Sequence, residues 1–195
     1  MPDACAHAAT PFIALIALLS ANALYWIADL NYHGFNRFVY FVLHLFATLC
    51  AAEAYIMMLA PLVSHFLMLI AIGAASFGFM MTVGGFIQPR SALPGPVLRY
   101  PLHYISFETY AFYGLLQNEF AGTHGWGCPC SAQPGGCPPA LGGSGCALSG
   151  TDVLRYWDVP LTWRRWRMLG VVAGWAVAFR IIFYATTTLK ERRAR

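Results

Sequence analysis

Four long apolar runs constrain the fold of this chain more than any other feature. They cover residues 11–27, 38–60, 62–86 and 168–189. A helix needs about 20 apolar residues to cross the hydrocarbon core of a bilayer, and each run is close to that length. Apolar residues make up 58% of the chain and charged residues 10%, so the charged fraction is far below that of soluble domains. The sequence therefore predicts an all-α, multi-pass membrane protein with about four transmembrane helices.

A proline-punctuated stretch, Gly84–Phe120, follows the third run. It stays apolar and aromatic, but its prolines break any continuous helix: Pro89, Pro94, Pro96 and Pro101. Irregular backbone is tolerated at membrane depth only where protein surrounds it. We therefore expect a re-entrant helical segment at residues 89–118 that enters the bilayer without crossing it.

The sequence of this stretch resembles the end of the transmembrane domain in the G subfamily of ABC transporters, the White-type half-transporters. There an apolar helix ends in a GGFF-like turn and leads to RYP-x-x-YISF, Y-A-x-x-G-L and NEF. The matching residues are Gly84, Gly85, Phe86, Arg99, Tyr100, Pro101, Tyr104, Ile105, Ser106, Phe107, Gly114, Asn118, Glu119 and Phe120. The resemblance implies that residues 1–195 are the C-terminal portion of an ABC-2 type transmembrane domain, from the family's third span onward.

The orientation in the membrane follows from the basic residues and the loop. Four of them follow the last run directly and place the C-terminus in the cytoplasm by the positive-inside rule: Lys190, Arg192, Arg193 and Arg195. Three arginines at the other end of that run nearly balance them: Arg164, Arg165 and Arg167. The loop at residues 121–160 determines the predicted orientation, because its cysteines suit an oxidising compartment and it corresponds to the family's extracellular loop. We expect an integral protein of the plasma membrane with a cytoplasmic C-terminus and a cysteine-rich external loop.

The loop cysteines, Cys128, Cys130, Cys137 and Cys146, could form a zinc site, a redox site or a disulfide framework. Zinc ribbons use paired C-x2-C knuckles, which are absent here, so we favour disulfides, with three possible pairings, and predict no metal site. A membrane thiol oxidoreductase that uses Cys128 and Cys130 is a further alternative. It is weakened because C-x-C is a weak signal and no quinone or flavin site is visible.

Two ionisable residues, Glu53 and Arg180, lie inside apolar runs, where charge is costly. At about 1.5 Å of rise per residue, Glu53 lies about 22 Å from Phe38 and Arg180 about 20 Å from Arg167, so their depths coincide. One interpretation is an intramembrane charge pair that fixes helix register or moves during transport. The other is that each side chain extends separately toward the inner interface.

The third run is rich in small residues, which permit close approach between helices. Such a face suits core packing or an apolar ligand. The resemblance implies that this helix lines a central cavity between the halves of a dimer. Its substrate-facing residues would be Ala74, Phe77, Gly78 and Met81. Phe86 and Ile87 would form an apolar plug above the cavity, unless they only pack against Tyr104 and Phe107 of their own chain.

No G-x-x-x-x-G-K-[ST] motif occurs, so we predict no catalytic residues, no cofactor and no ATPase activity in this chain. The resemblance implies the membrane-spanning part of an ATP-driven exporter of lipid-like or other apolar substrates. A nucleotide-binding domain supplied elsewhere would use ATP and Mg²⁺, and the chain would be a piece of a longer product or work with separate chains. The expected partners are the lipid bilayer and a second half-transporter, as a homo- or heterodimer, and not nucleic acid. The alternative is a truncated, non-transporting subunit that dimerises with full-length relatives and regulates them.

Overall fold

The computed structural model describes residues 2–27, 30, 35–93, 95–123, 126–127 and 147–194. Four of its helices are long and apolar enough to cross a membrane: Thr10–Ile27, Phe35–Leu62, Phe66–Val83 and Arg165–Arg192. They belong to α1 (Pro2–Ile27), α2 (Phe35–Leu59) with the 3₁₀ turn η1 (Ala60–Leu62), α3 (Phe66–Val83) and α7 (Arg165–Ala194). The prediction of an all-α, multi-pass membrane protein is confirmed.

The break between α2 and α3 lies at a proline. Pro61 has no backbone N–H and lies in η1, and Val63 after it is extended, with φ −116° and ψ 126°. Helix α3 therefore begins at Phe66, later than the start of the apolar run. It ends at Val83, before the pair Gly84–Gly85, where Gly85 has a φ of 93° that side-chain-bearing residues rarely adopt.

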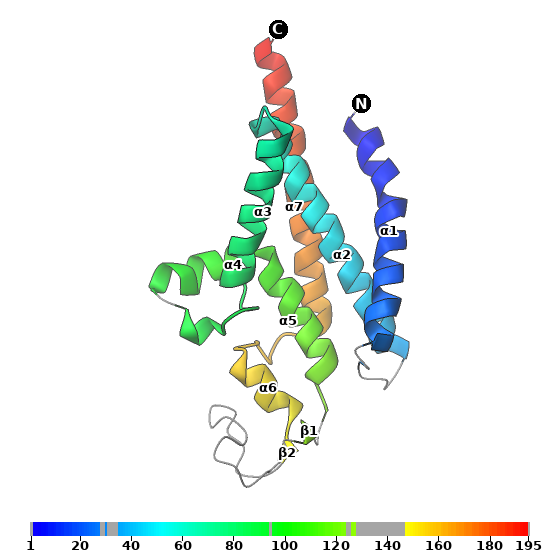
Figure 1. Cartoon of the computed structure of the whole chain (residues 1–195), viewed down its shortest axis with the longest axis vertical. Helices are drawn as coiled ribbons and strands as arrows, with labels where there is room; N and C mark the ends of the chain where they lie inside the picture. Colours follow the sequence, from blue (N-terminus) through cyan, green and yellow to red (C-terminus); the bar gives the residue numbers. More distant parts are fainter. Residues whose placement is uncertain are drawn as a thin grey trace.

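The helices α2 and α7 pack side by side at the centre, with α1 and α3 on their flanks (Figure 1). Both termini lie at one end of the molecule, and the connection between α5 and α6 lies at the opposite end. An aromatic cluster joins four helices at the core. The ring centroid of Tyr55 lies 5.5 Å from that of Phe77, 6.4 Å from that of Phe107 and 5.3 Å from that of Phe179.

The segment after α3 is a series of short helices, as expected for a re-entrant segment. It contains η2 (Arg90–Ala92), the π-helical turn η3 (Leu98–Leu102), α4 (His103–Ile105) and α5 (Phe107–Phe120). Pro101 lies inside the π turn. Helix α5 has 14 residues, too few to span a bilayer, and runs back toward the α5–α6 connection (Figure 1).

A short antiparallel pair, β1 (Trp126–Gly127) and β2 (Ala147–Leu148), closes the base of the predicted external loop. Helix α6 (Gly150–Tyr156) follows β2, and Ser149 caps it through a capping box with Asp152. The four loop cysteines lie outside the described residues, so the disulfides stay a prediction. Cys50 in α2 is free.

Helix α5 approaches α2 closely at a glycine. His44 Nε2 of α2 lies 2.9 Å from the carbonyl oxygen of Ala111, and the Tyr40 hydroxyl donates to the carbonyl oxygen of Arg165 at 2.7 Å. A methyl group at Gly114 would lie 2.5 Å from His44 Nε2 and 2.9 Å from the Tyr40 hydroxyl oxygen. Because the His44 ring is fully buried and already hydrogen-bonded, it has no room to move.

We expect Gly114→Ala to lower the free energy of unfolding by about 1–3 kcal/mol, because it overpacks the contact between α2 and α5. The matched control is Gly174→Ala in α7, where a methyl group would meet nothing within 4 Å. Alanine is the better helix former, so the control should unfold at the wild-type temperature or above it. Thermal unfolding of the purified chain in detergent measures both. Equal midpoints for the two variants would contradict this account.

Candidate functional site

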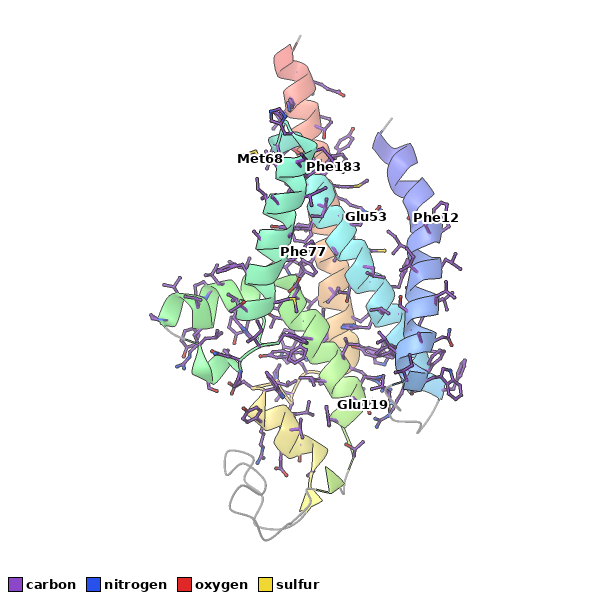
Figure 2. All side chains as sticks on the ribbon, in the orientation of Figure 1. Phe12, Glu53, Met68, Phe77, Glu119 and Phe183 are labelled. Atoms are coloured by element: carbon purple, nitrogen blue, oxygen red, sulfur yellow. The ribbon has the colours of Figure 1, made fainter. Side chains whose placement is uncertain are left out.

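The structure brings the two intramembrane charges together. Arg180 Nη2 of α7 lies 3.3 Å from Glu53 Oε2 of α2, within hydrogen-bonding distance. The Glu53 side chain is 19% exposed and that of Arg180 35% exposed, so the pair lies at the edge of the α2–α7 contact (Figure 2). Each charge offsets part of the cost of placing the other in an apolar environment. The pair therefore links the two central helices at a defined register.

The four predicted cavity residues do not share one environment. Ala74, Gly78 and Met81 are exposed on the outer side of α3. Phe77 is half-buried, and Figure 2 shows it on the side of α3 that is turned toward α2 and α7. Its ring centroid lies 5.5 Å from that of Tyr55 and 6.3 Å from that of Phe107. At 3.6 residues per turn, Phe77 lies at the edge of the stripe that the other three form, which explains its contact with the core.

Two glycines of α3, Gly73 and Gly78, also differ in their surroundings. A methyl group at Gly73 would lie 2.7 Å from the Cδ1 atom of Ile56 in α2, whereas one at Gly78 would meet nothing within 4 Å. Gly73 therefore allows α2 and α3 to approach each other. Gly78 lies on a side of α3 that the described part of the chain leaves uncovered.

The predicted plug residues lie just beyond the end of α3. Phe86 is 53% exposed and Ile87 59% exposed. The ring centroid of Phe86 lies 5.5 Å from that of Phe112 in α5, in an edge-to-face arrangement. The ring of Phe86 thus contacts Phe112 and not Tyr104 or Phe107, the two residues that the sequence suggested as alternatives. More than half of each side chain is left for contact with another molecule.

A buried histidine fixes the turn that carries Phe86 and Ile87. His103 is 1% exposed, and its Nδ1 lies 2.7 Å from the carbonyl oxygen of Val83, the last residue of α3. Because a carbonyl only accepts, Nδ1 donates, and Nε2 accepts from the Tyr113 hydroxyl at 3.0 Å. The Thr109 hydroxyl donates to the carbonyl oxygen of His103 at 2.8 Å. No sequence signal predicts this role, since His103 occupies a variable position of the RYP-x-x-YISF pattern.

A second polar contact holds the other end of α5. Arg37 Nη1 of α2 donates to the carbonyl oxygen of Asn118 at 2.8 Å, and Asn118 Nδ2 donates back to that of Arg37 at 3.2 Å. Asn118 Oδ1 also accepts from Arg165 Nη1 of α7 at 3.0 Å. Asn118 belongs to the NEF motif, and the structure shows that it joins α2, α5 and α7.

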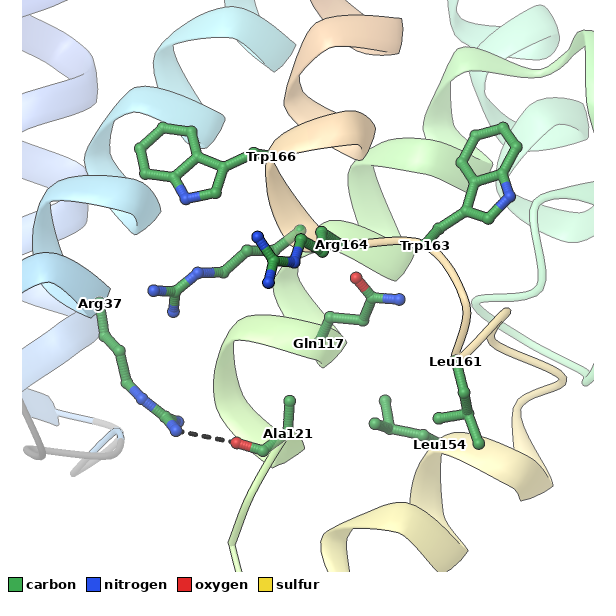
Figure 3. Close-up of a pocket in the computed structure, with 9 residues that line it drawn as sticks. Arg37, Gln117, Ala121, Leu154, Leu161, Trp163, Arg164 and Trp166 are labelled. Atoms are coloured by element: carbon green, nitrogen blue, oxygen red, sulfur yellow. Dashed lines mark hydrogen bonds between the residues drawn. The ribbon is translucent and has the colours of Figure 1, made fainter.

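Two cavities lie on either side of the connection between α6 and α7. The first, which we call the basic pocket, has a volume of about 500 Å³ and contains Arg37, Arg164 and Arg165 (Figure 3). The second has a volume of about 410 Å³ and is lined by His103, Tyr113 and other residues of the re-entrant segment. Among the described residues, no group of histidines, cysteines and carboxylates could hold a metal ion.

Comparison with known proteins agrees with this architecture. The ABC-2 type transporter family matches residues 6–120. Among curated relatives, ABC transporter G family member 11 of Arabidopsis thaliana is 33% identical over 94% of this chain and 24% of its own length. ABC transporter G family member 1 of Petunia hybrida is 31% identical over 90% of this chain and 24% of its own length.

The chain thus spans about a quarter of the length of these relatives. The candidate spans of α1, α2 and α3 and the re-entrant segment lie within the matched portion, whereas α7 follows it, after the external loop and α6. The family match covers more than half of the chain, and both relatives carry the name of one subfamily. On these grounds the chain belongs to the ABC-2 type transporter family, as transmembrane-domain sequence of the G subfamily of ABC transporters.

Proposed function

We propose that this chain forms the membrane-spanning part of an ATP-driven exporter of lipid-like or other apolar substrates. Its family already makes it an integral membrane protein with a role in transport. The observation that carries the proposal is the uncovered side of α3, which presents Ala74, Gly78 and Met81 away from the chain's own core. ATP and Mg²⁺ would bind to a nucleotide-binding domain outside this chain.

The character of α3 supports an apolar cargo. Only 11% of its residues are buried, against 22% for the spans of α2 and α7, so it is the least covered of the four candidate spans. Phe66–Val83 contains no charged residue. In a dimer with a second half-transporter, two such helices would enclose a cavity lined by small, aromatic and thioether side chains. Flexible apolar surfaces of this kind accommodate ligands of variable shape.

The proposed location is the plasma membrane. In the proposed orientation the α5–α6 connection lies outside the cell, and both described ends of the chain lie in the cytoplasm. The basic tail at the end of α7 supports it, because such residues favour the cytoplasmic side. In this orientation Phe86 and Ile87 lie at the outer end of α3. They would meet their symmetry mates and seal the cavity by excluding water, as hydrophobic constrictions do in channels.

The direct test is transport by a complete transporter that carries this segment. In proteoliposomes we expect ATP-dependent movement of a fluorescent sterol analogue. Gly78→Leu should lower the initial rate of transport about tenfold. The bulky side chain would fill the cavity, and overpacking of this kind costs about 1–3 kcal/mol. The control is Gly170→Leu in α7, which also starts from a helical glycine with no neighbour within 4 Å. The same loss of rate in both variants would count against a cavity beside α3.

This test also separates the exporter from the regulatory alternative. A regulatory subunit would dimerise with a full-length relative and change that relative's transport. In that case Gly78→Leu in this chain would leave the choice of substrate unaltered.

The plug makes a separate prediction. Shrinking both Phe86 and Ile87 to Ala in the complete transporter should loosen the seal and raise leakage of the sterol analogue without ATP. Leucine at both positions preserves the volume and should leave leakage unchanged. Cysteine at either position should crosslink the two subunits. No crosslink in any nucleotide state of an intact dimer would mean that these residues only pack against their own chain.

The charge pair predicts a non-additive double mutant. Replacing either Glu53 with Gln or Arg180 with Gln leaves one charge without its partner, at a cost of about 2–3 kcal/mol by insertion scales. The double replacement should recover part of that loss, because no unpaired charge remains. Thermal unfolding of the three variants in detergent gives the coupling free energy between Glu53 and Arg180. Strictly additive effects would show that the two side chains act independently despite their 3.3 Å separation.

A further inference from the structure

The basic pocket lies where two membrane helices begin. Helix α2 starts at Phe35 and the span of α7 at Arg165, so the pocket lies at the membrane boundary opposite the C-terminus (Figure 1). Its wall includes Trp163, which is 38% exposed, and Trp166, which is 47% exposed. Tryptophan is enriched at the headgroup level of bilayers, because its ring is apolar and its N–H is polar. The pocket is therefore at the depth of lipid headgroups.

The pocket carries positive charge that none of its described lining residues neutralises. Arg37 donates to the carbonyl oxygens of Asn118 and Ala121, and Arg165 donates to the side-chain oxygen of Asn118. None of these acceptors is charged, and none of the described lining residues is acidic. The Arg164 side chain is exposed and makes no hydrogen bond or ion pair within the described part of the chain.

Gln117 adds a buried acceptor without a partner. Its side chain is 6% exposed, and Nε2 donates to the carbonyl oxygen of Pro160 at 2.9 Å, which fixes the orientation of the amide. Oε1 is then buried with no hydrogen-bond donor. Figure 3 shows Gln117 in the middle of the pocket wall, between the arginines and Leu161. A buried acceptor of this kind is unfavourable unless a donor reaches it.

We propose that the basic pocket binds a phosphate ester, namely the headgroup of a glycerophospholipid in the leaflet on this side of the membrane. Arginine suits this role because its planar guanidinium presents two parallel donors to phosphate oxygens. Arg164 and Arg165 hold the phosphate, and Gln117 Oε1 accepts from a headgroup hydroxyl or ammonium group. Trp163 and Trp166 contact the glycerol and the first acyl carbons. The volume of about 500 Å³ is within the usual range of small-ligand sites.

This lipid is distinct from the exported substrate. The pocket lies between α2, α5 and α7, whereas the proposed cavity lies beside α3. The headgroup would therefore join the three helices that Asn118 already links. The site requires neither ATP nor a second subunit, so its test is independent of the exporter proposal.

The experiment titrates the purified full chain in detergent with phosphatidylglycerol and measures lipid binding by native mass spectrometry. We expect Arg164→Gln to weaken binding about tenfold, as the loss of a charge-assisted hydrogen bond would. Arg164→Lys keeps the charge and should bind with intermediate affinity. The matched control is Arg167→Gln, since Arg167 is also exposed and lies three residues further along the chain but does not line the pocket. It should bind as tightly as the wild type.

Two further ligands identify what the pocket recognises. Diacylglycerol with the same acyl chains lacks the phosphate and should not bind measurably. If glycerol 3-phosphate does not displace the lipid, the site takes a membrane lipid. If it displaces the lipid at similar concentration, the site takes a free phosphate ester. Equal binding of phosphatidylglycerol by wild type and Arg164→Gln, an equal loss in Arg167→Gln, or equally tight binding of diacylglycerol would overturn the proposal.

Discussion

The hydrogen bond between His103 Nδ1 and the carbonyl oxygen of Val83 determines how the chain leaves α3. Inside a bilayer, irregular backbone is tolerated only where its polar groups find partners in the protein. His103 supplies that partner, and its other ring nitrogen accepts from Tyr113 of α5. One buried ring thus connects the end of α3 to α5. The exposed positions of Phe86 and Ile87, and the return path of α5, both depend on this contact.

The chain consists of a fixed part and a less constrained part. The Glu53–Arg180 pair joins α2 to α7, and the contacts of Asn118 join α5 to both of these helices. Helix α3 touches this unit through Gly73, Phe77, Met80 and the His103 turn, and most of its other residues are exposed. A cavity wall that changes shape during transport is expected to come from the less constrained part.

Hydrophobic length alone predicted the membrane helices, because crossing a bilayer requires about 20 apolar residues in a row. Helical rise also placed Glu53 and Arg180 at one depth. The contacts of His103 and Arg37 could not be predicted in this way. Arg37 meets Asn118 across 81 residues of sequence, and no local pattern signals such a pairing. The contacts of Phe77 with Tyr55 and Phe107 could not be predicted either, because a residue at the edge of a helical stripe can face the core or the outside, and only its neighbours in the fold determine which.

The two glycines of α3 show how its inner and outer sides differ. Gly73 and Gly78 are separated by little more than one turn, and both make room for something larger. At Gly73 that neighbour is Ile56 of the same chain, so the small residue serves internal packing. At Gly78 the described chain offers no neighbour within 4 Å, although the helix is apolar along its whole length. Lipid tails, another part of a longer protein, a second subunit or a passing substrate would cover this side. A second subunit that brings its own α3 would turn the open side into an enclosed path, which is why the proposed cavity requires a dimer.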